Sequence, residues 1–563
     1  MSSPDVAHPA EITTPHDLLL TGSALGVASR LVPDTAWGKF GMKLARRPDM
    51  LAQRVGSFGR ELTSIATGTS DRAPVKADSR FSDPAWSGNP LLKRSMQTYL
   101  AAAEMVQNLF AEADLNWRDA ERIRFVLDVI LESSAPSNNP LISPLGWKAM
   151  IDTGGLSVVR GVRRFLADMA APPRIPSMVE PDAFTVGEDL AVTPGAVVYR
   201  NDIFELIQYT PQTKKVWTVP LLMVPPVINK FYILDLAPGR SMVEYFVRQG
   251  HQVFAMSWRN PTAANRAWDS DDYGGAIVDA FDAVQRITGS ESAHVQASCS
   301  GGILAAMTAA HLCATGDADR IASLTLMVTV LDQVRAGVSG AVDETTAKLA
   351  IALSARKGYL DGRALAEVFA WLRPTDLVWR YWVNNYIQGR SPTPFDVLFW
   401  NADTTRMTAA LHRDLVTIGL ENALTEPGAV RMLGTPVDLG TVTADTYVVA
   451  GVADHISPWQ ACYRSARLLG SKELRFVLST SGHIAALVNP PDNPKASYRV
   501  GSVDQRSSRR WASEAERCSD SWWPDFSAWL SQRGGDQKTA PKRLGGDGLT
   551  VLAPAPGTYI HER

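Results

Sequence analysis

The apolar and polar positions divide the chain into two parts with different predicted architectures. Over residues 90–133 the apolar positions recur at three- and four-residue steps, as in NWRDAERIRFVLDVILESS, which is typical of a helix that buries one face. Asn116 stands where an N-cap is needed, because its side chain can accept a hydrogen bond from the first turn. Further helical sequence ends near Met169, and four prolines between 172 and 181 mark a connection. We therefore expect a mainly helical N-terminal domain over residues 1–190.

Residues 191–563 alternate short apolar runs with amphipathic stretches. The runs predict strands at 217–226, 253–258, 293–298, 324–332, 446–451 and 474–480. Between them, AIVDAFDAVQRI places Ile277, Phe281 and Val284 on one helical face. Buried strands joined by crossover helices predict a mostly parallel sheet with helices on both faces, an α/β fold. The polar stretch 531–546 predicts a linker.

The alternation of strand and helix is interrupted once. Residues 337–437 form a long, largely helical and Trp-rich insertion between two predicted strands. Insertions of this kind often cover an active site, so we expect a helical cap here. With those of SWWPDFSAW near residue 525, its aromatic side chains contribute to an unusually high count of 16 Trp, which calls for an explanation beyond core filling. For single tryptophans, packing in a core is the more frequent role. The four in the insertion are Trp371, Trp379, Trp382 and Trp400.

Composition narrows the class of protein. The chain has 563 residues, with 56 Lys and Arg against 58 Asp and Glu, which supplies no basic surface for nucleic acid. No apolar run reaches the roughly 18 residues of a membrane span, and the first residues lack the pattern of a signal peptide. The four cysteines form no CxxC pair, which argues against a disulfide scaffold or a zinc site and favours a reducing, cytoplasmic compartment.

Cys299 is the strongest candidate nucleophile. In HVQASCSGGILAAM a predicted strand leads through small residues into a helix, which is the layout of a nucleophile elbow. The usual pattern is G-x-S-x-G, and here Ala297 occupies the first position and cysteine the third. The alternative is a buried, inert cysteine in a glycine-containing turn.

Two later strand ends support the catalytic interpretation. TYVVAG is followed by Asp454, and LRFVLST is followed by His483. Nucleophile, acid and histidine, each after its own strand, is the chain order of α/β-hydrolase triads. His483 would exchange a proton with Cys299, and Asp454 would orient the imidazole. The Ser300 amide, with an amide of the 227–229 loop centred on Ile228, would form the oxyanion hole.

The remaining chemistry-bearing residues have simpler interpretations. Four histidines lack the strand-end context and are expected to be structural or exposed: His294, His311, His412 and His455. Three cysteines are expected to be passive thiols: Cys313, Cys462 and Cys518. Asp376 and Asp396 are expected to cap helices or form ion pairs.

From about Val192 to its end the sequence resembles the polyhydroxyalkanoate synthases. The resemblance rests on long motifs rich in Trp, Pro and Gly. They are PGAVVYRNDIFELIQY, PLLMVPPVINKFYILDL, VFAMSWRNP, ASCSGG, FAWLRPTDLVWRYWVNNY, FDVLFWNADTTR, GVADHISPW, SGHIAALVNPP, SWWPDF and PAPGTYI. Two positions depart from the family's usual pattern, because Ala297 and Asp520 stand where glycine is common.

This resemblance implies an α/β-hydrolase fold and an acyltransferase with the triad Cys299, Asp454 and His483. Such enzymes polymerise (R)-3-hydroxyacyl-coenzyme A and release coenzyme A, which is part of the substrate, so no cofactor is expected. The resemblance also implies a homodimer at the surface of cytoplasmic polyester granules, with granule-associated proteins as further partners. Because the implied product is apolar, some of the aromatic side chains of the insertion and of SWWPDFSAW are expected to line a dry route for the acyl chain and the polymer. In style the motifs are closest to the single-subunit, medium-chain branch. A thioesterase or polyester depolymerase on the same scaffold is the alternative function, and a non-catalytic granule protein is a third.

Overall fold

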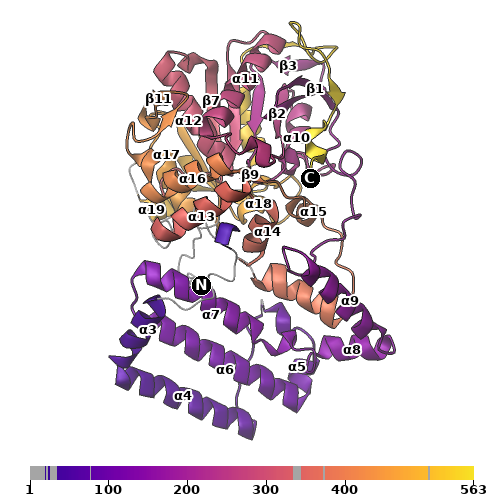
Figure 1. Cartoon of the computed structure of the whole chain (residues 1–563), viewed down its shortest axis with the longest axis vertical. Coiled ribbons are helices and arrows are strands. Elements are labelled where there is room, and N and C mark those ends of the chain that lie inside the picture. The colour runs from indigo at the N-terminus through magenta and orange to yellow at the C-terminus, as the bar shows by residue number, and fades with distance from the viewer. Residues whose placement is uncertain are drawn as a thin grey trace. The chain divides into compact units, whose positions relative to one another are not determined.

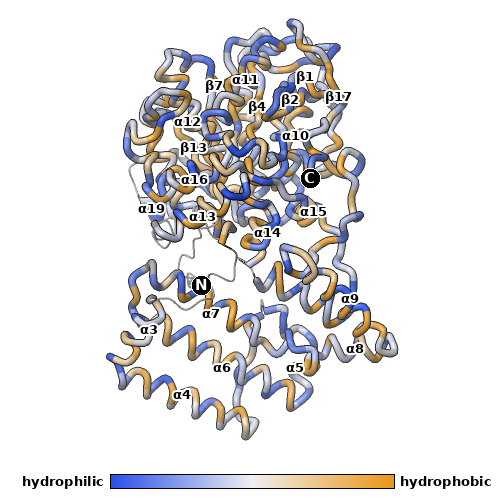
Figure 2. Tube along the Cα trace, in the orientation of Figure 1, coloured by the Kyte–Doolittle hydropathy of each residue, from blue (hydrophilic) through white to orange (hydrophobic). Residues whose placement is uncertain are grey.

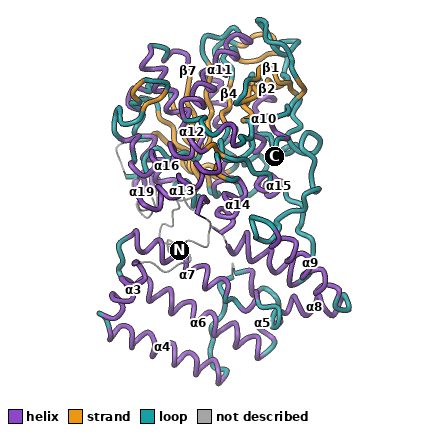
Figure 3. The backbone as a smooth tube through the Cα atoms, viewed as in Figure 1, coloured by secondary structure: helices purple, strands orange, loops and turns teal. Residues whose placement is uncertain are grey.

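The computed structural model describes residues 20, 23–25, 35–76, 78–333, 344–371, 374–504 and 507–563. The chain forms two compact units (Figure 1). The sheet unit contains Pro181–Leu365 and Phe395–Arg563, and the helical unit contains Leu25–Glu180 and Ala366–Pro394. Strands occur in the former, whereas the latter consists of helices and loops (Figure 3). The boundary at 190 and a covering role for 337–437 stay predictions; the middle of that insertion belongs to the helical unit.

The helical unit contains the amphipathic helix predicted around residue 125. Asn116 caps α7 (Trp117–Ser133) by accepting a hydrogen bond from the Asp119 amide at 3.1 Å, and Ile123 and Val126 are buried. Hydrophobic and hydrophilic positions alternate along the helices of this unit (Figure 2). Further helices of this unit are α3 (Thr35–Ala45), α4 (Pro48–Thr67), η1 (Ser79–Phe81), α5 (Ala85–Gly88), α6 (Pro90–Glu112), η2 (Pro136–Asn138), α8 (Pro144–Asp152), α9 (Leu156–Ala170) and the π-helical turns η6 (Thr375–Trp379) and η7 (Trp382–Ile387).

Helix α9 packs against η7, although more than 200 residues separate them. The ring of Phe165 lies edge-on to Trp382 and Tyr386, with centroids 5.9 and 5.4 Å away. The Tyr386 hydroxyl donates to Asp168 Oδ2 at 2.6 Å. A Cβ on Gly161 would lie 2.0 Å from the Tyr386 carbonyl oxygen, so this approach needs glycine.

The sheet unit is built on an 11-stranded sheet in the order β15-β14-β13-β12-β7-β6-β4-β5-β2-β1-β17. Its six central strands run parallel; five of them lie within the predicted runs, and β7 begins three residues before the predicted run 324–332 and ends within it. They are β4 (Leu221–Val224), β5 (Val253–Trp258), β6 (Ala293–Ser298), β7 (Ile321–Met327), β12 (Thr446–Gly451) and β13 (Leu474–Ser479). The flanking antiparallel strands are β1 (Gly195–Arg200), β2 (Phe204–Tyr209), β14 (Ser497–Ser502), β15 (Glu516–Ser519) and β17 (Ala553–Pro554).

Helices pack on this sheet through apolar faces. In α11 (Ser270–Thr288) the predicted face of Ile277, Phe281 and Val284 is buried, and α12 (Cys299–Thr315) is buried over most of its length. Apart from four short strands, the described part of the insertion is largely helical, as predicted; its α-helices are α13 (Glu344–Lys357), α14 (Gly362–Trp371), α15 (Asp396–Ala402) and α16 (Ala409–Glu421). The remaining helices are α10 (Met242–Arg248), α17 (Trp459–Ala466), α18 (His483–Leu487), α19 (Ser508–Glu514) and α20 (Trp523–Ser531).

The polar stretch 531–546 is more than a linker. It contains β16 (Gln537–Thr539), which pairs antiparallel with β3 (Lys215–Trp217). The linker prediction was wrong there, because this strand forms through a partner far away in sequence rather than through apolar residues of its own. Two further small sheets pair β8 (Tyr359–Leu360) with β9 (Met407–Thr408), and β10 (Arg431–Met432) with β11 (Thr435–Pro436).

Candidate active site

Cys299 lies at the turn from β6 into α12, where the elbow was predicted. Its φ is +51°, a left-handed conformation that non-glycine residues rarely adopt and that is typical of strained functional turns. A Cβ on Gly301 would lie 2.3 Å from the Pro225 carbonyl oxygen, and one on Gly302 would lie 2.1 Å from Thr329 Oγ1. The two glycines therefore allow α12 to start close against the neighbouring strand ends, which places the thiol above the sheet.

Asp454 and His483 meet above the ends of the adjacent strands β12 and β13. His483 Nδ1 donates to Asp454 Oδ2 at 2.7 Å, and both residues are buried. Asp454 Oδ1 accepts the backbone amides of Ile456 and Ser457 at 2.8 and 2.9 Å. Because its second oxygen is occupied in this way, the carboxylate holds one orientation and fixes the imidazole.

The ionisation of His483 also depends on Cys299. Burial alone would lower the pKa of His483, but the charge and hydrogen bond of Asp454, together with a hydrogen bond and the charge of Cys299, raise it to about 10. The raised pKa favours an imidazolium beside the thiol. That arrangement favours a thiolate, which is the nucleophilic form of cysteine. The structure thus brings the three predicted triad residues together.

The two predicted oxyanion residues lie on facing segments. Ser300 is in the first turn of α12, where amides have no acceptor within the helix. The Val227 amide donates to Ser300 Oγ at 3.1 Å, so it is already engaged. Ile228, the next residue, is buried, and its carbonyl accepts the hydroxyl of Thr405. This leaves the Ile228 amide as the predicted partner of Ser300, and the oxyanion role of both stays a prediction.

Sequence reasoning missed what holds His483 in place. Helix α18, which begins at His483, has only five residues and cannot be stable alone. The Trp522 indole donates to the Ala486 carbonyl at 2.8 Å, and the Trp523 indole donates to the Leu487 carbonyl at 3.1 Å. Both indoles are fully buried in the core of the sheet unit. They anchor the histidine helix, so the expectation that they line a product route was wrong.

Asp520, two residues before this tryptophan pair, is one of the two departures from the family pattern. Asp520 has a φ of +94°, a region that favours glycine, and its carboxylate accepts the Ser521 amide at 2.6 Å. Glycine is thus the residue the backbone requires there, and Asp520 holds the same turn under strain. The other departure, Ala297, lies in β6 without positive φ.

The residues assigned simpler roles are engaged elsewhere. His294, His311 and His412 each bond a Ser or Thr hydroxyl through Nδ1, at 2.8, 2.9 and 2.7 Å. Asp396 pairs with Arg240, as predicted for an ion-pairing carboxylate. Burial raises the pKa of the Cys462 thiol well above its usual value, which makes it a poor nucleophile.

The described ranges hold neither a metal-binding cluster nor a membrane-spanning helix. Nowhere within them do three or more His, Cys, Asp or Glu side chains cluster in a way that could hold a metal ion. No helix in the described part of the chain is both long and apolar enough to cross a bilayer.

Comparison with known proteins gives a consistent result over nearly the whole chain. Residues 77–246 match the family described as "Poly-beta-hydroxybutyrate polymerase (PhaC) N-terminus", and residues 233–490 match "alpha/beta hydrolase fold". The chain is 46% identical over 519 residues to Poly(3-hydroxyalkanoate) polymerase 1 of Ectopseudomonas oleovorans, covering 92% of each chain. It belongs to the poly(3-hydroxyalkanoate) polymerase family. Polymerase 2 of the same organism is 43% identical, again over 92% of each chain.

A less similar member of the polymerase family also aligns with this chain over nearly its whole length. The polymerase subunit of Cupriavidus necator is 37% identical over 530 residues, which is 92% of this chain and 89% of that one. The predicted family and the predicted α/β-hydrolase fold are both confirmed, the fold by the family match together with the parallel sheet and its elbow.

Proposed function

We propose that this polymerase transfers (R)-3-hydroxyacyl groups from coenzyme A thioesters to the hydroxyl end of a growing polyester, with Cys299 as nucleophile. The observation that carries the proposal is His483, which bonds Asp454 at 2.7 Å and also contacts the Cys299 thiol. The names of its relatives support the polymer as product. No cofactor is needed, because coenzyme A enters as part of the substrate.

In the first step the Cys299 thiolate attacks the carbonyl carbon of the incoming thioester. The amides of Ser300 and Ile228 stabilise the oxyanion that forms. When the intermediate collapses, the bond to the coenzyme A sulfur breaks, and that sulfur takes the proton of the His483 imidazolium. The products are an acyl-Cys299 thioester, free coenzyme A and a neutral histidine.

In the second step neutral His483 accepts the proton of a 3-hydroxyl, and the hydroxyl oxygen attacks the acyl-Cys299 carbonyl. The ester bond forms, the bond to Sγ breaks, and the thiolate–imidazolium pair returns. Cysteine suits this reaction because exchange between two thioesters is nearly isoenergetic, so the acyl group stays activated for transfer. Water must be excluded, since it competes for the same intermediate.

Product analysis distinguishes the polymerase from a hydrolase on the same scaffold. The purified chain is incubated with (R)-3-hydroxybutyryl-coenzyme A and, separately, with a medium-chain homologue, and coenzyme A release is followed. Insoluble polyester is the expected product, whereas free hydroxy acid alone would contradict the proposal. Mass spectrometry of the polymer identifies which monomers are accepted.

The assembly and location of the chain follow from the same proposal. We expect a homodimer that works in the cytoplasm at the surface of polyester granules, with granule-associated proteins as further partners. Analytical ultracentrifugation with and without substrate tests the dimer. Fluorescence microscopy of the tagged chain in polymer-producing cells tests the location; diffuse signal beside granules would contradict it.

A further inference from the structure

The loop Val227–Tyr232, which we call the oxyanion loop, is held from one side by the segment Trp400–Thr405. The Trp400 indole donates to the Lys230 carbonyl at 2.7 Å, and Thr405 Oγ1 donates to the Ile228 carbonyl. Between them, Asn229 forms an antiparallel bridge with Thr404. Three successive residues of the loop thus have their backbone fixed by one remote segment.

The Lys230 side chain holds the loop from a second direction. Its ammonium is buried and donates to the carbonyl of Ile560 and, at 3.1 Å, to that of Glu562, while Asp403 Oδ1 lies 3.0 Å away. A lysine has three N–H donors, and these three acceptors engage all of them. A buried charge is tolerated only with such partners, so the ammonium is fixed rather than free to bind a substrate phosphate.

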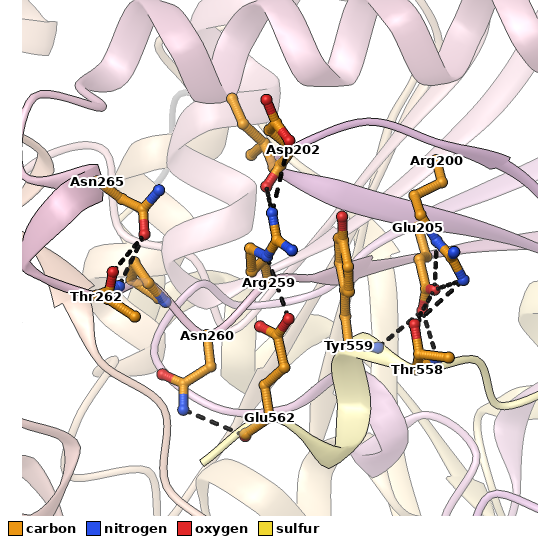
Figure 4. Close-up of polar contacts among 12 residues, drawn as sticks. Arg200, Asp202, Glu205, Arg259, Asn260, Thr262, Asn265, Thr558, Tyr559 and Glu562 are labelled. Atoms are coloured by element: carbon orange, nitrogen blue, oxygen red, sulfur yellow. Dashed lines mark hydrogen bonds and ion pairs between the residues drawn. The ribbon is translucent and has the colours of Figure 1, made fainter.

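The segment Thr558–Glu562, which supplies two of these acceptors, is itself attached to the sheet (Figure 4). Glu205 on β2 accepts the amides of Thr558 and Tyr559 at 2.9 and 3.0 Å. Glu562 is held by two residues just after β5. Its side chain accepts from Arg259 Nε at 3.1 Å, and its carbonyl accepts from Asn260 Nδ2 at 3.2 Å. The segment is therefore a rigid support.

We propose that Lys230 is a positioning residue for the transfer reaction: by tying the oxyanion loop to Thr558–Glu562, it fixes where the Ile228 amide points. This rests on the proposed function, in which that amide stabilises the oxyanion. An oxyanion donor acts only at about 2.7–3.1 Å from the developing charge, so a loop that shifts by a fraction of an ångström loses much of the effect.

The decisive variant is Lys230→Met, which keeps the aliphatic stem and removes the ammonium. We expect kcat for coenzyme A release to fall about 10- to 100-fold with little change in KM, less than the roughly 10²–10³-fold cost of deleting an oxyanion donor. Alkylation of Cys299 by iodoacetamide should keep its normal rate, because attack on that methylene carbon develops no oxyanion. A role in overall folding or in thiol activation would slow both reactions.

Two sets of variants control this test. Lys538→Met removes another lysine–carbonyl contact, from Lys538 Nζ to the Thr288 carbonyl at 2.7 Å, and should leave both reactions unchanged. Thr405→Val removes the hydroxyl that holds the Ile228 carbonyl and should reproduce the selective loss, whereas Thr405→Ser should restore it. If Lys230→Met does not fold, the two Thr405 variants still test whether transfer depends on the position of the oxyanion loop.

The outcomes separate this inference from the proposed function. If the unaltered chain releases no coenzyme A, the proposed function fails. If it does, normal coenzyme A release by Lys230→Met or by Thr405→Val overturns the positioning role, and so does an equal loss of release and alkylation.

Discussion

The two sides of the active site are built in different ways. On the acid–base side, Asp454 and His483 each follow a parallel strand within a few residues, and they meet because neighbouring parallel strands end at one edge. On the oxyanion side, the loop after β4 depends on Trp400–Thr405 and on Thr558–Glu562, which are distant in sequence. The identity of the candidate catalytic groups is therefore a local property of strand ends, whereas their exact placement depends on long-range contacts.

The largest loss of kcat should come from Asp454→Asn, which removes the carboxylate beside His483. The amide keeps the shape but removes the charge that orients His483, so kcat for coenzyme A release should fall by about 10²–10⁴-fold. Asp454 raises the pKa of His483, which is about 10 in the unaltered chain. In the variant the imidazolium should therefore lose its proton at lower pH. Titration of the histidine rings by NMR measures this, and an unshifted titration would contradict the assignment.

A smaller loss should follow from loosening the support of His483. Trp522→Phe keeps an aromatic ring, although a smaller one, and leaves the Ala486 carbonyl without its donor, a cost of about 1–3 kcal/mol in a buried site. We expect kcat to fall about tenfold and the melting temperature to drop.

The matched control for this tryptophan is Trp529→Phe. Trp529 is also buried, but its indole N–H has no hydrogen-bond partner among the described residues. Its replacement should leave kcat unchanged. Equal kcat losses in the two variants would show that general packing, rather than the bond to α18, supports the histidine.

The smallest effects are expected from substitutions at the two positions that depart from the family pattern, Asp520 and Ala297. Asp520→Gly should stabilise the chain by about 1 kcal/mol, because glycine adopts a φ of +94° without strain. Ala297→Gly replaces the other departure from the family pattern, in a strand, and should destabilise by about 0.5–1 kcal/mol. Urea unfolding followed by circular dichroism measures both. Destabilisation by Asp520→Gly would show that its bond to the Ser521 amide outweighs the strain.

The sequence allowed prediction of the parallel core and the triad because both depend on local signals. Runs such as TYVVAG are buried on both faces, and the SGG turn meets a steric requirement that the structure shows at Gly301 and Gly302. The flanking strand β14 carries the polar sequence SYRVGS, and β16 lies in a stretch whose composition alone predicts a linker. Such strands form because a partner is already in place, which no local pattern reveals.

The same limit applies to the supporting contacts of the site. The indoles of Trp522 and Trp523 could be recognised as members of a motif, but not as donors to α18. Likewise, nothing near Lys230 in the sequence indicates that its ammonium binds the carbonyls of Ile560 and Glu562. These contacts join segments whose proximity is decided only by the completed fold.

The most direct test of the account is to trap the acyl-enzyme. The unaltered chain and Cys299→Ala are mixed with (R)-3-hydroxybutyryl-coenzyme A, quenched in acid within milliseconds to seconds, digested and analysed by mass spectrometry. The account predicts a 3-hydroxybutyryl group on the peptide that contains Cys299, and loss of coenzyme A release by at least about 10⁴-fold in the alanine variant. Acylation at another residue, or normal coenzyme A release by Cys299→Ala, would contradict it.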